Sequence, residues 1–358
     1  MSIVCFEPLP QISGMNSDDI LPIDLDALAG WMDHQGIGRG PLHDAVLLTG
    51  GSQNILLQFR RGEHSLILRR PALNPRSEAD KTILREARIL GALADSGVPH
   101  PEIVGVGNDP GIIGAAFFLM KEVAGFNATV SIPDFVRNDP TIRHRMGLAL
   151  IDGLAALATV DPSAVGLSDL GRLEGFLERQ VRRWAAQLDS YTQYKGWTGR
   201  ADLGDLDAVA AWLEAHCPQH SQPGLIHGDY HIGNVLYRDD GNLAAILDWE
   251  MATLGDPLMD LGRLLATWPT GDPAHPVMRV DPLSGYPTPD ELVARYAQLT
   301  GRDLSDLLWF EIMGYYKLGL IFEGTYARAQ DGRAEMTTGF RLHHAAKGLL
   351  ERARQRIG

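Results

Sequence analysis

The order of strand-like and helix-like segments is the feature of this sequence that most constrains its fold. The first third of the chain contains short apolar runs between polar turns, a pattern typical of strands: residues 45–48, 55–59, 66–68 and 117–120. Residues 83–94 place apolar side chains at helical spacing instead, and from about residue 134 onward the pattern is mostly helical. Because strands and helices are segregated along the chain, we predict an α+β fold, with a small antiparallel-sheet lobe followed by a larger, mainly helical lobe.

Composition and charge exclude some classes of protein. The 358 residues carry a formal net charge of −13, which argues against a general nucleic-acid binder or a binder of anionic membranes, because those need basic surface. Cys5 and Cys217 are too few for a disulfide framework or a four-cysteine zinc site. The N-terminus lacks a signal-peptide pattern, and the longest apolar stretch, residues 112–120, is too short to span a bilayer. We therefore expect a cytoplasmic protein.

A β-hairpin is predicted where Asp240-Gly241 separates two apolar runs. Asn234 stands just before the first of these strands, and Asp248 stands just after the second. Antiparallel pairing therefore brings both residues to the same end of the hairpin. An amide oxygen beside a carboxylate is a pair of hard ligands suited to magnesium.

The loop that enters this hairpin carries a second acid. Asp229 lies five residues before Asn234 and could accept a proton from a hydroxyl placed near a metal-bound phosphate. Alone, such a carboxylate could equally bond its own backbone in a turn. The full segment is more specific: His227-Gly228-Asp229-Tyr230-His231-Ile232-Gly233-Asn234, ahead of a hairpin that ends in Asp248.

This segment resembles the catalytic loop of the aminoglycoside phosphotransferase and choline kinase superfamily, distant relatives of protein kinases. The resemblance implies a bilobal protein-kinase-like fold that uses ATP and Mg²⁺ to phosphorylate a hydroxyl of a small molecule. It also implies Asp229 as the catalytic base, with Asn234 and Asp248 as the magnesium ligands. Asp260, farther along, is expected to brace the catalytic loop.

The N-terminal part fits the same superfamily at the phosphate-binding positions. Residues 49–54 would form the loop over the ATP phosphates, with Gly51 and Ser52 as contacts. Arg69 occupies the strand position where the family usually has a lysine for the α- and β-phosphates, and Glu86 on the next helix would pair with it. An arginine there is a departure, because its reach and geometry differ from those of lysine. The alternative is that Arg69 and Glu86 are ordinary surface charges.

The adenine-binding positions are also implied by the resemblance. Ile67 would cover the adenine ring from the same strand face as Arg69. The segment Met120-Lys121-Glu122-Val123 resembles the hinge between lobes, whose Lys121 carbonyl and Val123 N–H would bind adenine. On this basis we expect a nucleotide-binding lobe over residues 1–123 and a catalytic and acceptor-binding lobe over residues 124–358.

Several further segments resemble the kinase-like domain attached to some acyl-CoA dehydrogenases: residues 68–71, 178–184, 247–257 and 321–328. That branch is linked to phosphorylation of hydroxyacyl-CoA substrates, which implies a hydroxyacyl-CoA or a hydroxy acid as the acceptor. The sequence departs from the branch at His231 and Gly233. Tyr326 and Arg328 could line the acceptor site or be structural. An anionic acceptor such as coenzyme A could bind a basic surface made of arginines: Arg179, Arg182, Arg183 and Arg328.

Three alternatives stay open at this point. One is an aminoglycoside O-phosphotransferase, which the net acidity favours because polycationic antibiotics bind acidic clefts. Another is a pseudokinase that binds the nucleotide without transferring phosphate, favoured by Arg69. The third is a metallohydrolase with His227, Asp229 and His231 as ligands, although it leaves the hairpin and the N-terminal lobe unexplained. The sequence predicts no oligomeric state.

Overall fold

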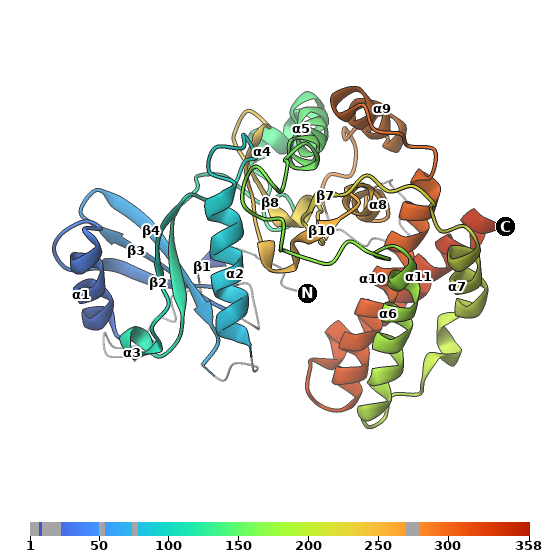
Figure 1. Cartoon of the computed structure of the whole chain (residues 1–358), viewed down its shortest axis with the longest axis horizontal. Coiled ribbons are helices and arrows are strands. Elements are labelled where there is room, and N and C mark those ends of the chain that lie inside the picture. The colour runs from blue at the N-terminus through green and yellow to red at the C-terminus, as the bar shows by residue number, and fades with distance from the viewer. Residues whose placement is uncertain (1–6, 9–22, 50–53, 74–77, 270–279) are drawn as a thin grey trace. The chain divides into compact units, whose positions relative to one another are not determined.

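The computed structural model describes residues 7–8, 23–49, 54–73, 78–269 and 280–358. The chain separates into two compact units (Figure 1). The first unit contains Met1–Val136, Val165–Leu167 and Gly233–Ala252, and the second contains Arg137–Ala164, Ser168–Ile232 and Thr253–Gly358. The functional boundary expected between residues 123 and 124 rests on the hinge resemblance and stays a prediction.

A six-stranded sheet forms the centre of the first unit, with strand order β1-β2-β3-β4-β6-β5 and antiparallel pairing throughout. Its strands are β1 (Glu7–Pro8), β2 (His43–Thr49), β3 (Asn54–Arg61), β4 (His64–Pro71), β5 (Ile103–Gly107) and β6 (Phe117–Lys121). Strand alternation sends neighbouring side chains of β4 to opposite faces. Leu66 and Leu68 therefore join one core, whereas Ile67 and Arg69 face the other way.

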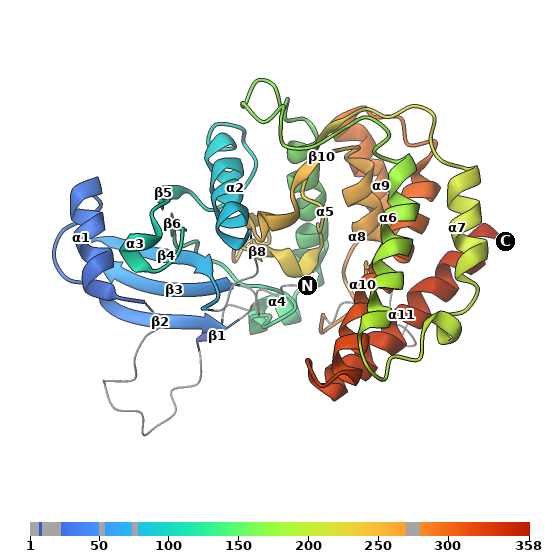
Figure 2. The same cartoon turned by 60° about the horizontal axis from the view of Figure 1, so that its bottom comes forward.

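Helices cover the two faces of this sheet (Figures 1 and 2). The Leu66 and Leu68 face packs against α1 (Leu25–Gln35) and α3 (Pro110–Ile113), which contribute Leu28, Met32 and Ile113 to the core. The Arg69 face packs against α2 (Ala79–Ala92). Glu86 is buried in the middle of α2, so this packing brings its carboxylate to the strand that carries Arg69.

The predicted hairpin belongs to the first unit. It consists of β8 (Val235–Tyr237) and β9 (Leu243–Ile246), preceded by a short 3₁₀ helix, η3 (Ile232–Asn234), and followed by another, η4 (Trp249–Met251). Val235 pairs with Ile246, so residues 234 and 247 lie side by side at the open end of the hairpin. The element α4 (Asp134–Asn138) lies where the two units divide.

The second unit is mainly helical. Its helices are α5 (Pro140–Ala158), α6 (Glu178–Asp189), η1 (Ser190–Gln193), η2 (Arg200–Leu203), α7 (Leu206–Ala215), α8 (Leu258–Leu265), α9 (Pro289–Thr300), α10 (Leu307–Gln330) and α11 (Met336–Ile357). The only sheet in its described part is the antiparallel pair β7 (Gly224–Ile226) and β10 (Thr253–Gly255). Of the helices that the structure describes, none combines the length and the apolar character needed to cross a bilayer.

Helix α10 is the core of this unit and packs against α11, α8, α6 and α7. Two glycines let α8 and α10 approach unusually closely. A Cβ added at Gly262 would lie 2.2 Å from the Phe310 carbonyl oxygen, and one added at Gly314 would lie 2.8 Å from the Gly262 carbonyl oxygen. Polar side chains from both helices can consequently reach the same loop.

Candidate active site

A pocket in the first unit has the composition expected of a nucleotide-base site. Apolar side chains from the sheet and from the hairpin line it, including Ile67, Leu236 and Leu247. Lys121 and Val123 line it too. The Lys121 N–H is donated to the Glu102 carbonyl at 2.9 Å, which holds the end of β6 in the sheet. Apolar walls with a short run of backbone suit a flat heteroaromatic ring.

Arg69 is the centre of a buried network in the same unit. Its Nε lies 2.9 Å from Glu86 Oε2, and its Nη2 lies 3.0 Å from Asp248 Oδ1 and 3.7 Å from Glu250 Oε2. Only 5% of the Arg69 side chain is exposed, so it is no ordinary surface charge. Burial alone would lower the pKa of Arg69, but Glu86 and the other two carboxylates raise it well above its ordinary value. The ion pair expected between Arg69 and Glu86 is therefore present.

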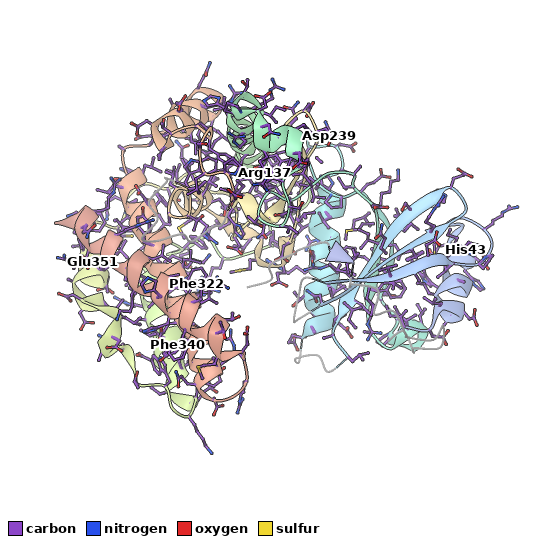
Figure 3. The ribbon with its side chains drawn as sticks, turned by 180° about the vertical axis from the view of Figure 1, so that it is seen from behind. His43, Arg137, Asp239, Phe322, Phe340 and Glu351 are labelled. Atoms are coloured by element: carbon purple, nitrogen blue, oxygen red, sulfur yellow. The ribbon has the colours of Figure 1, made fainter. Side chains whose placement is uncertain are left out.

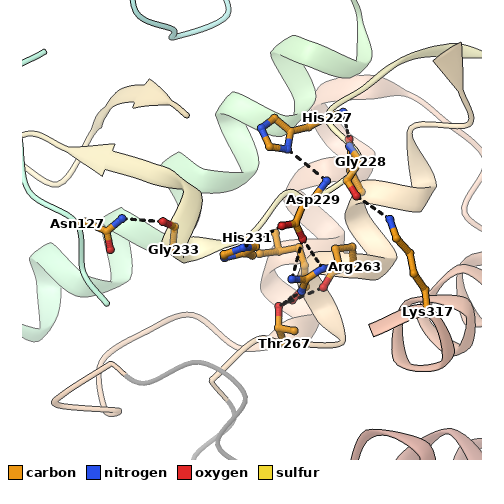
Figure 4. A network of polar contacts seen from close by, with 11 residues as sticks. Asn127, His227, Gly228, Asp229, His231, Gly233, Arg263, Thr267 and Lys317 are labelled. Atoms are coloured by element: carbon orange, nitrogen blue, oxygen red, sulfur yellow. Dashed lines mark hydrogen bonds and ion pairs between the residues drawn. The ribbon is translucent and has the colours of Figure 1, made fainter. Parts of the chain in front are cut away.

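Asn234 and Asp248 lie at the same end of the hairpin. The Leu247 N–H donates to the Asn234 carbonyl at 2.8 Å, directly ahead of Asp248. Asp248 adopts a left-handed conformation, with φ of 62°, which is uncommon for a residue other than glycine and is often found at functional sites. Asn127 fixes the backbone on both sides of Asn234. Its Nδ2 donates to the Gly233 carbonyl at 2.7 Å (Figure 4) and to the Val235 carbonyl at 3.3 Å.

The charge of this network fits a divalent cation. Three carboxylates, those of Glu86, Asp248 and Glu250, surround the single guanidinium of Arg69. Burial, together with the carboxylates of Asp248 and Glu250, raises the pKa of Glu86 to about 7, although Arg69 lowers it. A hard cation held by the oxygens of Asn234 and Asp248 would reduce this excess of negative charge, and both are ligand types that Mg²⁺ accepts.

Asp229 lies in the second unit, in the loop after β7, and its carboxylate is held by a buried cation (Figure 4). Arg263 on α8 donates from Nε at 3.0 Å and approaches from Nη2 at 2.9 Å, both to Oδ1. His231 Nε2 lies 3.6 Å from Oδ2. Burial alone would raise the pKa of Asp229, but Arg263 and His231 hold it well below its ordinary value. The carboxylate is therefore ionised throughout the neutral pH range.

The backbone of the same loop is fixed from three directions. Asp260 on α8 accepts the N–H of His227 at 2.6 Å and that of Gly228 at 2.8 Å, which is the bracing role expected for it. The Asp229 N–H points to His227 Nδ1 at 3.3 Å. Lys317 on α10 donates to the Gly228 carbonyl at 2.7 Å (Figure 4). The close packing of α8 on α10 brings these two helices to one loop.

The positions expected for the phosphate loop, Gly51 and Ser52, lie outside the described residues. The alternating His227, Asp229 and His231 do not form a metal-binding cluster. Within the described ranges, no group of three or more His, Cys, Asp or Glu side chains could hold a metal ion.

The arginines expected to form one anion-binding surface are spread along two helices. Arg183 lies next to Trp184 on α6, and the Trp184 ring lies 5.3 Å from Lys317 Nζ on α10. Arg328 follows Lys317 by about three helical turns, roughly 16 Å along the axis. Arg183 and Arg328 therefore do not form one phosphate-sized site.

Tyr326 lies among aromatic side chains near the end of α10. Its ring centroid is 4.3 Å from that of His343 and 5.5 Å from that of Phe340 on α11. Phe340 is 55% exposed (Figure 3). These contacts give Tyr326 a packing role, and they neither require nor exclude a contact with an acceptor.

Four residues of the two networks were not singled out by the sequence: Asn127, Glu250, Arg263 and Lys317. Two signals were available. Arg263 follows Asp260 by three residues on a helix and so shares its face, and Lys317 interrupts a long apolar helical run. Asn127 and Glu250 lie in irregular segments, where no periodicity predicts the direction of a side chain.

Comparison with known proteins agrees with this geometry. The model of the phosphotransferase enzyme family matches residues 44–298, so the chain belongs to that family. The enzyme class expected from the sequence, a small-molecule phosphotransferase, is confirmed, as is the α+β kinase-like fold. Acyl-CoA dehydrogenase family member 11 from Gallus gallus is 29% identical over 314 residues, which cover 85% of this chain and 39% of that protein. The chain spans between 29% and 43% of the length of this protein and six other curated relatives that it matches.

Solved structures show the same fold. A Ralstonia eutropha protein assigned to the aminoglycoside phosphotransferases is 25% identical, with a TM-score of 0.78 and coverage of 94% of this chain and 98% of that one. The GDP complex of aminoglycoside 2'-phosphotransferase-IIIa is 17% identical, with a TM-score of 0.60 and coverage of 90% and 97%. At that identity the likeness concerns the fold alone.

Proposed function

We propose that this chain is an ATP- and magnesium-dependent kinase that transfers the γ-phosphate to a hydroxyl of a hydroxyacyl-CoA or a hydroxy acid. The observation that carries the proposal is the Arg69 network. In this network Arg69, the proposed phosphate-binding cation, contacts Asp248, the proposed metal-binding carboxylate. Both residues belong to the unit that also contains the pocket proposed for adenine. A structural ion pair does not need a surplus of carboxylates or a strained aspartate.

Each candidate site residue of the first unit has one role in the proposal. Ile67, Lys121 and Val123 bind the adenine, and the family resemblance assigns Gly51 and Ser52, which lie outside the described residues, to the phosphates. Arg69 binds phosphate oxygens through its planar fork, and Glu86 keeps the guanidinium in place. Asn234 and Asp248 hold magnesium, which when bound neutralises charge on the transferred phosphoryl group. Arg69 has to exchange Asp248 for phosphate when the nucleotide enters.

Asp229 orients the acceptor hydroxyl and accepts its proton. Its depressed pKa makes it a weak base. Phosphoryl transfer through a loose, metaphosphate-like transition state makes little demand on base strength, because the hydroxyl loses its proton late. Orientation and charge matter more, and both depend on the ion pair with Arg263.

The favoured acceptor is anionic. The negative charge of Asp229 is already compensated by Arg263, so the base is not surrounded by the acidic field that would attract a polycation. The names of the curated relatives also connect this type of domain to acyl-CoA chemistry. The solved GDP complex shows that a guanine nucleotide binds one relative, so GTP is a necessary comparison for ATP.

An ATP-consumption screen with the full chain and magnesium tests the proposal. The panel contains hydroxyacyl-CoAs, free hydroxy acids, choline-like alcohols and aminoglycosides, each with ATP or GTP. We expect turnover with a hydroxyacyl-CoA or a hydroxy acid. Efficient phosphorylation of kanamycin-type acceptors alone would replace this acceptor class by the aminoglycosides. Nucleotide binding without turnover on any acceptor would identify a pseudokinase.

A further inference from the structure

Lys317 is a buried lysine with few partners. It lies in the middle of α10, where the neighbouring residues from Ile312 to Leu320 are buried, and it is itself 9% exposed. Within the described part of the chain, its ammonium donates one hydrogen bond, at 2.7 Å to the Gly228 carbonyl, and lies 5.3 Å from the Trp184 ring centroid. Burying an ammonium that has no carboxylate directly against it costs stability. Packing alone therefore does not explain a lysine at position 317.

The carbonyl that accepts the hydrogen bond of Lys317 belongs to the peptide that precedes the Asp229 side chain. The Gly228 carbonyl and the Asp229 N–H are the two ends of one peptide unit, and Gly228 has φ of +83°. Glycine has no Cβ, so the plane of this peptide can rotate at low energetic cost. His227 holds the N–H end through a long contact of 3.3 Å, and Lys317 holds the carbonyl end at 2.7 Å.

We propose that Lys317 is a positioning residue for phosphoryl transfer, which holds the Gly228–Asp229 peptide so that the Asp229 carboxylate faces the acceptor hydroxyl. The inference rests on the proposed function, because it assigns Asp229 as the base. Arg263 fixes the carboxylate and Lys317 fixes the backbone, so the two cations restrain different torsions of one residue (Figure 4). Lys317 does not touch the reacting atoms.

The surroundings of Lys317 give this role a dependence on pH. Burial lowers the pKa of Lys317, and Arg263 and Arg183 act in the same direction. Asp229 and Asp260 raise it, and the resulting pKa is about 8. Below about pH 8 the ammonium is charged and holds the carbonyl strongly. As pH rises through that value the amine becomes neutral, the hydrogen bond weakens and kcat should fall.

Three variants separate positioning from packing. Lys317→Arg keeps a charge that does not titrate near pH 8, so it should retain activity and lose the alkaline decline. Lys317→Met keeps the apolar stem without the charge. It should lower kcat by roughly 10- to 100-fold at pH 7, the scale of a displacement of about 1 Å, and leave the KM for ATP unchanged. The exposed lysine Lys347 provides the control, and Lys347→Met should match the wild type.

The experiment measures kcat between pH 6 and 10 with the acceptor found in the screen, together with thermal unfolding of each variant. We expect Lys317→Met to unfold at the same temperature as the wild type or higher. In the wild type, ¹³C NMR of the lysine side chains should give Lys317 the same midpoint as the loss of kcat, a comparison that does not depend on any variant folding. An alkaline decline that persists in Lys317→Arg, or Lys317→Met with normal kcat, would overturn the inference. A wild-type chain that transfers phosphate to no acceptor would overturn the proposed function first, and this inference with it.

Discussion

At the scale of single residues, the two networks use arginine in different ways. Arg69 is surrounded by more carboxylates than it can neutralise, whereas Arg263 forms a one-to-one pair with Asp229. In the proposed function, the excess negative charge of the first arrangement binds a metal ion, and its guanidinium binds phosphate. The second keeps a carboxylate ionised and fixed. Both guanidiniums are almost completely buried, so replacing either should have effects well above those of a surface substitution.

Replacing Arg69 tests its role at the phosphates. Arg69→Lys keeps the charge that the family usually provides there, so it should keep substantial activity. Arg69→Gln should raise the KM for ATP and lower kcat, because it removes the cation and leaves buried carboxylates unpaired, at a cost of about 3–5 kcal/mol in stability. Arg60→Gln, at an exposed position on β3, is the matched control. Normal ATP kinetics in Arg69→Gln would contradict the assignment.

Replacing Arg263 should change the response to pH. The wild-type pKa of Asp229 lies well below its ordinary value, so no acidic loss of kcat from this group is expected near neutrality. In Arg263→Gln the pKa of Asp229 should rise, because burial remains and the opposing cation is gone. Asp229 then becomes protonated at a higher pH than in the wild type, so kcat should fall on acidification from pH 7 to 5. Arg263→Lys should restore part of the wild-type profile. Identical acidic limbs in all three proteins would exclude this role.

At the scale of elements, helix α8 positions Asp229, the proposed base, because it packs closely against α10. Its residues Asp260 and Arg263 hold the backbone of the loop and the carboxylate of Asp229, and α10 contributes Lys317. Gly262 lies between these two residues of α8 on the face toward α10, where its missing side chain permits the contact. The spacing of the two helices therefore contributes to the geometry of the proposed active site.

A single methyl group tests that spacing. Gly262→Ala would place a Cβ 2.2 Å from the Phe310 carbonyl oxygen, so the helices must separate. We expect a loss of about 1–3 kcal/mol in the free energy of unfolding, typical of overpacking, and a fall in kcat as the loop moves. Gly91→Ala on α2 is the control, since a Cβ there meets nothing within 4 Å, and it should stabilise by about 0.5–1 kcal/mol. Equal effects of the two changes would contradict the account.

The sequence predicted the elements that have a clear period or a turn signal. The strands around Arg69, helix α2 and the hairpin after Asp229 follow from local patterns, whereas the Arg69–Glu86 pair followed from the family resemblance. The strands β7 and β10 have three residues each, too few to show alternation. Local signals mark Arg263 and Lys317 as unusual positions but do not predict the atoms that they contact, because Asp229 and Gly228 are 34 and 89 residues away in sequence. Such contacts depend on helix packing, which no local pattern encodes.

At the scale of the whole molecule, the first unit contains every described residue that we propose for the nucleotide and the metal, and the second unit contains Asp229, the proposed catalytic base. Binding of a nucleotide should therefore stabilise the first unit directly. With AMP-PNP and magnesium at about 100 times the Kd, the gain is about 2.7 kcal/mol. Amide exchange in β4, β6 and the β8–β9 hairpin should slow, and chelation of the metal should remove most of the effect. Protection confined to the second unit would contradict the assignment of the pocket.

The central claim is tested most directly by measuring phosphoryl transfer and nucleotide binding side by side in Asp229→Asn and Asp248→Asn. Asp229→Asn should lower kcat by about 10²- to 10⁴-fold, the usual contribution of a general base, and leave the Kd for AMP-PNP with magnesium unchanged. Asp248→Asn should weaken magnesium-dependent binding of AMP-PNP itself. Equal loss of nucleotide binding in both variants, or normal transfer in Asp229→Asn, would contradict the account.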